Sequence, residues 1–482
     1  MAEVTRRDFG KLAAAAGCAV ALPGWASGSN PMIGIQVGAV SFVDEGVEAV
    51  LDRCQRDAAV NTLFIAAFSY GRGIAGRQVP GQPLPDHGKQ EYDTGFHGGN
   101  FARVHSQYYR NTSLKDIRAT DYGNFDVLGD VIPAARARSM KSICWYEDVF
   151  RRDLEGIDRL QEVMLSGKKA GTLCFHNPEV QAFWGGLTED FVRSYPLDGI
   201  MWGSERQGPF GNAIRSVHGG GRDPMSVTCF CSYCRHEATR RGIDVQRAVE
   251  GYTKLAELVQ TSSRPSDGYF VSYWRLLVQY PEILGWEKLW NDGLQSTYAS
   301  LYKLTKSVRP EIGVGWHIWH NNSFSSFYRA EQDYSEFRRY SDFLKVVMYN
   351  NCGGPRLASY VRGVSHTIFG DFAPEAVLEW TYGVQNYKEA SLEEIPQRGL
   401  SADYVARETK RALAGVGGAV RIWPGIDIDI PTAADEKKTE PEDVRESVRA
   451  ALGAGADGVI LSRKYSEMRL ANLRAAGQAV RT

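Results

Sequence analysis

The sequence lacks any strong excess of charge of one sign. Its 482 residues include 56 Lys and Arg against 57 Asp and Glu, which gives a net charge of −1, and no Lys/Arg-rich stripe is visible. A protein that binds nucleic acid through its phosphates is expected to carry such a stripe. The composition therefore argues against a nucleic-acid partner and is consistent with a neutral substrate.

Long apolar runs are also missing. No stretch approaches the ~20 uninterrupted apolar residues that a membrane-spanning helix needs, and Leu12–Leu22 is too short. This run follows the twin arginines Arg6 and Arg7 and precedes small residues. Such an order is typical of an export signal and resembles a twin-arginine translocation signal. We expect residues 1–28 to be this signal and residues 29–482 to be exported, to the periplasm or beyond, without a membrane span.

Internal repeats and low-complexity linkers are absent too, so no second domain is required. Instead, short β-rich runs alternate with longer helical patterns. Eight runs are expected to be strands, and Pro424 is expected to end or bulge the seventh: Met32–Phe42, Asn61–Tyr70, Ser142–Tyr146, Gly199–Trp202, Gly313–Trp319, Phe343–Tyr349, Ala419–Ile428 and Gly458–Ser462. Eight strands alternating with helices predict an α/β fold, a (β/α)₈ TIM barrel. An open, doubly wound sheet is the alternative.

The loops that follow the strands of such a barrel form its active face. Residues 71–124 and 207–223 are rich in loop-forming residues, so we expect long loops there. Polar and aromatic residues near the strand ends are the candidates for substrate contact, because aromatic rings can stack on sugars. The candidates are Trp145, Tyr146, Glu147, Asp148, Arg206, Trp316, His317, Trp319, His320, Tyr349, Asn350 and Asp429.

Carboxylates at two of these ends suggest acid–base chemistry. Glu205 follows the fourth strand through a glycine turn and is the candidate general acid/base. Glycoside hydrolysis needs a second carboxyl group. Asp427 at the end of the seventh strand is the first choice, and Glu379, Asp148 and Glu147 remain open. No cofactor is expected for catalysis.

Three cysteines, Cys229, Cys231 and Cys234, fall within six residues, and Cys174 lies upstream. Four thiolates at this spacing can hold Zn²⁺ in a closed, structural site. In an exported protein Cys174 could instead form a disulfide with one of the three. Free thiols, or three thiols with a histidine as the fourth ligand, are also compatible with this spacing.

Three segments in order carry a family resemblance: residues 173–180, 195–200 and 229–244. They resemble the hypothetical glycosyl-hydrolase-like barrels, which are similar in architecture to the family 42 β-galactosidases and the α-L-fucosidases. The resemblance implies a TIM barrel with a carbohydrate substrate. It maps the acid/base glutamate that ends the fourth strand to Glu205, and it maps a zinc-binding cysteine cluster to Cys174, Cys229, Cys231 and Cys234. The sequence departs from the pattern at Gly203-Ser204, where an aspartate often stands, and no Glu clearly ends the seventh strand.

We therefore expect an exported glycoside hydrolase that cleaves an O-glycosyl bond of a plant or microbial glycan. Two other classes compete with it: a non-catalytic glycan-binding barrel, and a metal-dependent hydrolase or isomerase that uses the histidines. The sequence is also compatible with a homo-oligomer.

Overall fold

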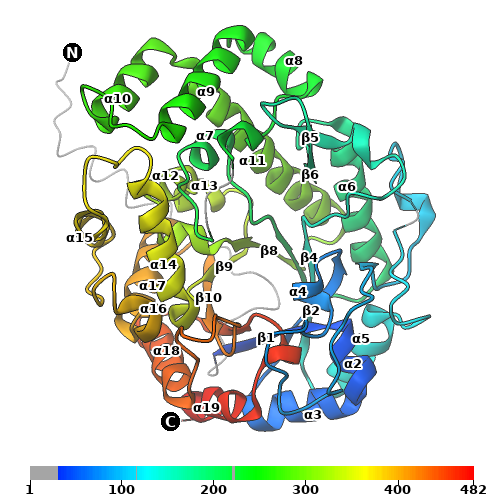
Figure 1. Cartoon of the computed structure of the whole chain (residues 1–482). Helices are drawn as coiled ribbons and strands as arrows, with labels where there is room; N and C mark the ends of the chain where they lie inside the picture. The colour runs from blue at the N-terminus through cyan, green and yellow to red at the C-terminus, as the bar shows by residue number, and fades with distance from the viewer. Residues whose placement is uncertain (1–30, 116, 220–222, 482) are drawn as a thin grey trace, which may run out of the picture.

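The computed structural model describes residues 31–115, 117–219 and 223–481 (Figure 1). The expected export signal, residues 1–28, lies outside these ranges. Within them, no helix is both long and apolar enough to cross a membrane.

Eight parallel strands form a closed barrel. The first strand pairs with both the second and the last, and this pairing closes the sheet and excludes the open doubly wound alternative. The predicted TIM barrel is confirmed. In chain order, its strands are β1 (Met32–Gly38), β2 (Thr62–Ser69), β4 (Lys141–Glu147), β7 (Gly199–Gly203), β8 (Gly313–Ile318), β9 (Phe343–Val347), β10 (Arg421–Asp427) and β11 (Gly458–Ser462).

All eight predicted strands are present, most with ends shifted by one or two residues, and the first and seventh strands differ from the prediction in a way that has a physical reason. The first ends at Gly38, where α2 (Ala39–Glu45) begins. The seventh does not end at Pro424, because β10 continues to Asp427 and Pro424 pairs with Val346 of β9. The prediction for Pro424 is wrong: proline removes one N–H donor, but its fixed φ is compatible with an extended strand.

Helices surround the strands (Figure 1). The helical segment before β8 is divided at Pro281, where one helix ends and the next begins. The main helices are α3 (Val47–Ala58), α5 (Val127–Ala137), α6 (Pro178–Ser194), α10 (Tyr269–Gln279), α11 (Glu282–Val308), α14 (Asn350–Ser365), α15 (Pro374–Gln385), α17 (Ala402–Val416), α18 (Pro441–Gly453) and α19 (Leu470–Arg481).

Among the described residues, two of the three apolar clusters lie against the barrel strands along most of their length. The larger lies between the strands and the helices. The smaller lies inside the barrel, where the rings of Phe343 and Trp423 stack with centroids 4.3 Å apart. It is completed by Met32, Phe64, Ala66, Ile143, Trp145, Met201 and Ile460. This packed interior leaves the carboxyl ends of the strands, which we call the barrel mouth, as the place for chemistry.

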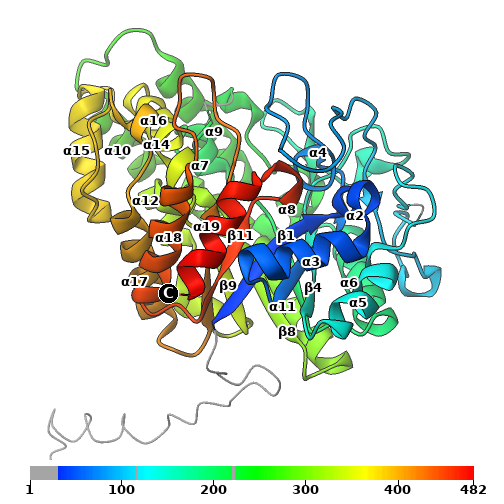
Figure 2. The ribbon, with the colours of Figure 1, turned by 90° about the horizontal axis from the view of Figure 1, so that it is seen from below.

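Long segments follow several strands. The loop after β2 contains only the short elements α4 (Arg72–Ala75), β3 (Gly99–Asn100) and η1 (Ser106–Tyr108) before α5, which agrees with its expected loop character. The loops after β2 and β10 rise on the same side of the barrel (Figure 2). Between β7 and β8 lie α7 (Pro209–Ala213), α8 (Ser232–Arg240) and α9 (Val245–Gln260), ahead of α10 and α11.

Candidate active site

A polar layer lies directly above the apolar interior of the barrel. Glu147 of β4 pairs in register with Gly203 of β7, Gly203 with His317 of β8, and His317 with Lys345 of β9. Glu147, His317 and Lys345 are all buried. Because paired residues lie at one level, four neighbouring strands bring a carboxyl, an imidazole and an amine together at the barrel mouth.

Glycines make room for these side chains. A Cβ atom at Gly203 would lie 2.9 Å from the Cβ of His317, and one at Gly425 would lie 2.9 Å from the Cε of Lys345. Real Cβ atoms are almost never that close to other atoms, so a larger residue would displace these neighbours. At Gly203 the sequence departs from the family pattern. The absence of a side chain there leaves the space that His317 occupies.

His317 links Glu205 to Lys345. Its Nε2 lies 2.9 Å from Oε1 of Glu205, and its Nδ1 lies 3.2 Å from Nζ of Lys345. Lys345 as an ammonium also donates to Oε1 of Gln36 at 2.6 Å and to the hydroxyl of Tyr349 at 3.0 Å. A donor at Nδ1 leaves the imidazole proton on Nε2, so His317 donates to Glu205.

The two glutamates are held in opposite protonation states. Burial, together with the charge of Glu205, raises the pKa of Glu147 to about 8, although the charge of Lys345 opposes the shift. Partial burial of Glu205 also disfavours its charge, but the hydrogen bond from His317, aided by the charge of Arg356, outweighs this and lowers the pKa of Glu205 to about 2. At neutral pH one group is an acid and the other a carboxylate.

Lys345 itself is only weakly basic. Burial lowers its pKa to about 7, against the opposing charges of Glu147 and Glu205. Burial and the charge of Lys345 also lower the pKa of His317, so its imidazole is neutral at pH 7.

A second group of side chains lies next to the polar layer, which it contacts through Tyr349. Nη1 of Arg356, on α14, lies 2.9 Å from Nδ1 of His320, and the rings of His320 and Tyr349 lie 5.4 Å apart. The ring of His218 lies 5.2 Å from that of Trp319 and 6.0 Å from that of His320. The structure therefore brings His320, Trp319 and Tyr349 together, as the sequence predicts.

Asp427 has a different role from the one predicted. It is fully buried, and its carboxylate accepts hydrogen bonds from the backbone N–H groups of Cys352 and Ile430, both at 3.0 Å, and from the hydroxyl of Thr439 at 3.2 Å. These contacts tie α14 and the loop after β10 to the barrel. As a correction, the second carboxyl that interacts with Glu205 is Glu147, one of the alternatives left open by the sequence.

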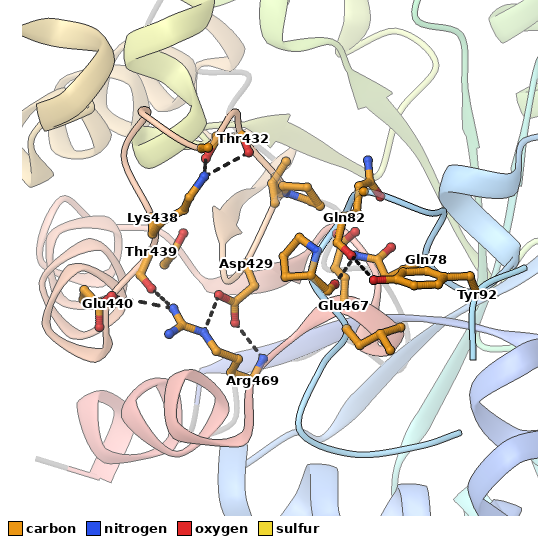
Figure 3. A pocket seen from close by; sticks show the side chains of 16 residues that line it. Gln78, Gln82, Tyr92, Asp429, Thr432, Lys438, Thr439, Glu440, Glu467 and Arg469 are labelled. Carbon is orange, nitrogen blue, oxygen red and sulfur yellow. Dashed lines mark hydrogen bonds and ion pairs between the residues drawn. The ribbon is translucent and has the colours of Figure 1, made fainter. Parts of the chain in front are cut away.

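Asp429 lies at the edge of the mouth rather than in it. It accepts hydrogen bonds from the backbone and from Nε of Arg469, and burial raises its pKa to about 6 (Figure 3). Both residues line a groove of about 630 Å³ between the loops after β2 and β10, together with Tyr92 and Lys438. The carboxylate of Asp429 is hydrogen-bonded to Arg469. Asp429 therefore anchors the loop after β10. Glu379 is exposed on α15.

Several predicted contact residues lie in the cores instead. Tyr146 points outward and its hydroxyl lies 2.7 Å from that of Thr188. Trp316 packs on Tyr298, with ring centroids 4.7 Å apart. Trp145 faces inward but belongs to the apolar interior, two residues below Glu147. Alternation along a strand divides its residues between two faces, but it does not say which face points into the barrel. The predictions that Tyr146 and Trp316 contact substrate are therefore corrected.

Asp148 and Arg206 form a buried ion pair beside the mouth. Nη1 of Arg206 lies 2.8 Å from Asp148, and Nη2 lies 2.8 Å from Glu162. The guanidinium also lies 4.3 Å from the ring centre of Phe175. With both ends of its fork engaged, Arg206 is a structural cation rather than the predicted substrate contact. Asn350 is buried at the first turn of α14.

The cysteines predicted as metal ligands form one cluster. The sulfur atoms of Cys174, Cys229, Cys231 and Cys234 all lie within 4.8 Å of one another. Two of the Sγ–Sγ separations, 3.5 Å between Cys174 and Cys231 and 3.6 Å between Cys174 and Cys234, are far longer than the ~2.05 Å of a disulfide. Within the described ranges, none of the four is disulfide-bonded.

Sequence reasoning missed Lys345 and Arg356. A signal for Lys345 was present, because it is the one charged residue in the otherwise apolar strand Phe343–Val347. Arg356 lies on a helix with other polar residues, and nothing in its sequence context separates it from a surface arginine.

No protein-family model matches the chain, and no curated protein matches it. Its fold is similar to a β-galactosidase from the Antarctic haloarchaeon Halorubrum lacusprofundi (TM-score 0.51, 13% identity, 93% of this chain and 57% of that one). It is also similar to a GH42 β-galactosidase from G. stearothermophilus (TM-score 0.50, 10% identity, 94% and 57%). The PgaB glycoside hydrolase domain from Bordetella bronchiseptica aligns at a TM-score of 0.48 and 13% identity over 90% and 94%.

This chain spans a little more than half of the length of those β-galactosidases. At these identities the likeness shows the fold. The structural neighbours are glycoside hydrolases built on the same barrel.

Proposed function

We propose that the protein is a glycoside hydrolase in which Glu147 and Glu205 are the catalytic carboxyl pair. The observation that supports this most directly is their opposite titration at the ends of neighbouring strands, with a pKa of about 8 for Glu147 and about 2 for Glu205. Hydrolysis of a glycoside needs one carboxylic acid and one carboxylate at neutral pH.

The roles follow from the protonation states. Glu147 holds a proton and donates it to the oxygen of the leaving group. Glu205 is ionised and either attacks the anomeric carbon or activates water against it. His317 holds Glu205 by its Nε2 hydrogen, and Lys345 holds His317. This assignment reverses the sequence expectation that Glu205 is the proton donor.

Activity on a panel of 4-nitrophenyl glycosides tests the proposal. Replacing Glu205 with Gln should lower kcat by several orders of magnitude on the substrate that the wild type cleaves. Loss of the proton donor in Glu147→Gln should lower it by roughly 10²–10⁴-fold. The anomer first released, followed by ¹H NMR, distinguishes retention from inversion.

Glu379→Gln is the matched control, because that glutamate is exposed on α15 and should leave the rate unchanged. Full activity in Glu205→Gln would contradict the proposal. Binding of glycans without hydrolysis by the wild type would favour the glycan-binding barrel.

The histidine-based metal enzyme has less support. Both ring nitrogens of His317 are engaged, by Glu205 and Lys345. Among the described residues, the cysteine cluster is the one group of three or more His, Cys, Asp or Glu side chains that could hold a metal ion.

We further propose that this cluster holds a structural Zn²⁺. Thiolates about 2.3 Å from a tetrahedral zinc lie roughly 3.8 Å from one another, close to the 3.5 and 3.6 Å observed. Although burial opposes it, the pKa of Arg206 is raised, in part by the charge of Cys174, and Arg206 adds a cation near the thiolates. Four sulfur ligands leave no position for substrate, so the metal would join the loop around Cys174 to α8.

Export remains part of the proposal because Arg6 and Arg7 stand a few residues ahead of a short apolar run. Detection of the mature protein outside the cytoplasm would support export. An Arg6→Lys, Arg7→Lys variant should no longer be detected there.

A further inference from the structure

We infer that the substrate is an anionic sugar, whose oxyanion (the carboxylate of a uronic acid or a sulfate ester) pairs with Arg356 at the barrel mouth. The inference rests on the proposed glycosidase function and names its substrate class. It begins from the position of Arg356, which lies in the second turn of α14, directly after the end of β9.

Arg356 is joined to the polar layer at the barrel mouth by a short series of contacts. Its guanidinium carbon lies 5.9 Å from the ring centre of Tyr349. The hydroxyl of Tyr349 lies 3.0 Å from Lys345, whose amine faces His317, the partner of Glu205. The charge of Arg356 also acts directly on Glu205. The guanidinium is therefore close to the place where a sugar would be cleaved.

Arg356 lacks a protein counter-ion there. Three other arginines of the fold with similar or deeper burial have one: Arg206 pairs with Asp148, Arg329 with Glu408 and Arg463 with Glu467. In the part of the chain that the structure describes, no carboxylate lies within 4.0 Å of Arg356. Removing a charge from water without a partner is costly, so a ligand anion would complete the site.

The neighbours of Arg356 orient it without neutralising it. Its Nη1 donates to Nδ1 of His320, which leaves the other ring nitrogen of His320 to donate to the hydroxyl of Tyr404 at 3.2 Å. Tyr404 in turn donates to Ser323 at 2.7 Å. One edge of the guanidinium is thus fixed by a buried network, and the remaining N–H groups are available.

Neutral imidazoles complete the surroundings. Burial, with the charge of Arg356 as the next cause, lowers the pKa of His218 to about 3 and that of His320 well below its ordinary value. Nε2 of His218 is buried and has no hydrogen-bond partner among the described residues. A neutral imidazole nitrogen can donate to a ligand oxygen, whereas a carboxylate in its place would have neutralised Arg356.

An oxyanion matches these donors. The planar fork of arginine forms paired hydrogen bonds with carboxylates and similar oxyanions, and charge-assisted bonds are the stronger ones. A neutral hydroxymethyl group would leave the charge of Arg356 unpaired. The near-zero net charge of the whole chain does not oppose this, because one cation in the mouth decides the local preference.

Matched 4-nitrophenyl glycosides provide the test. Three substrates share ring configuration and anomer and differ only in the C-6 group on C-5, which is CH₂OH, a carboxylate or CH₂OSO₃⁻. We expect the wild type to have a kcat/KM at least tenfold higher on one anionic substrate than on the neutral one. In Arg356→Gln the ratio of anionic to neutral kcat/KM should fall roughly 10- to 100-fold.

Arg356→Lys and Arg362→Gln sharpen the comparison. Lysine retains the charge but loses the fork, so preference for a carboxylate should fall further than preference for a sulfate. Arg362 is exposed in the last turn of the same helix, and its substitution should leave the ratio unchanged.

Equal rates on neutral and anionic substrates would overturn the inference while leaving the glycosidase proposal intact. So would an equal loss on both substrates in Arg356→Gln, because it would mean that Arg356 acts only through the ionisation of Glu205. If no substrate is hydrolysed, calorimetric binding of methyl uronides and methyl glycosides separates the two proposals. Uronide binding that depends on Arg356 would support the subsite alone. Equal binding of uronides and neutral glycosides would overturn it.

Discussion

Glu205 accepts a hydrogen bond from Nε2 of His317 at 2.9 Å, and the opposite nitrogen of the same ring faces Lys345 at 3.2 Å. About half of the Glu205 side chain is exposed, whereas His317 is buried. A fixed imidazole thus presents an ionised carboxylate at the barrel mouth, beside a glutamic acid held neutral by burial.

Replacing His317 with Ala should move the acid limb of the pH–rate profile. Without the hydrogen bond, the pKa of Glu205 should rise from about 2 to at least the ordinary value of ~4.3. The variant should lose kcat/KM as the pH falls below about 5, while the wild type keeps it to lower pH. Circular dichroism at each pH controls for unfolding, and superimposable profiles would count against this role of His317.

Glu147 should set the alkaline limb. Its pKa of about 8 means that the proton needed by the leaving group is lost as the pH rises through 8. In Glu147→Gln the limb should disappear, and the loss of rate should be small for a 2,4-dinitrophenyl leaving group, which needs little protonation. A rate loss independent of the leaving group would assign Glu147 another function.

The same shift predicts a direction for stability. The folded protein keeps the Glu147 proton up to about pH 8, whereas the unfolded chain releases it near pH 4.3. The contribution of Glu147 to folding is therefore fully present below about pH 4.3 and is lost as the pH rises to about 8. Urea unfolding should show a smaller decline across this range in Glu147→Gln than in the wild type.

Gly203→Ala should disturb the polar layer at the barrel mouth. Its Cβ would lie 2.9 Å from the Cβ of His317, both on buried strands, and overpacking of this kind costs about 1–3 kcal/mol. We expect a lower Tm and a reduced kcat. Gly453→Ala is the control, because a Cβ there meets no atom within 4 Å; equal behaviour of the two variants would refute the packing argument.

Asp427→Asn should weaken the fold rather than the pH profile. Asp427 accepts three hydrogen bonds that anchor α14 and the loop after β10, and losing the charge-assisted part should cost roughly 1–3 kcal/mol. Asp435→Asn, at an exposed position of that loop, is the control. A loss of kcat with unchanged Tm would restore Asp427 as a catalytic candidate.

The zinc proposal predicts one metal ion per chain by elemental analysis. Cys231→Ser should remove the metal and lower the Tm, because the ion joins segments that are distant in the sequence. Cys54→Ala, a buried cysteine outside the cluster, should retain it. Wild-type protein prepared with zinc in excess but containing no metal would refute the proposal.

The sequence by itself determined the barrel, because strand and helix periodicities are local and all eight strand runs were visible in it. It also indicated Glu205 and the four cysteines, which depend on position after a strand and on spacing. Only the tertiary structure decided which carboxyl group accompanies Glu205. Glu147 and Asp427 both end strands, but cross-strand register brings Glu147 level with His317 and Lys345, while backbone N–H groups from distant segments occupy Asp427. Which face of a strand is inside, and whether an arginine has a counter-ion, are properties of packing between segments far apart in the chain.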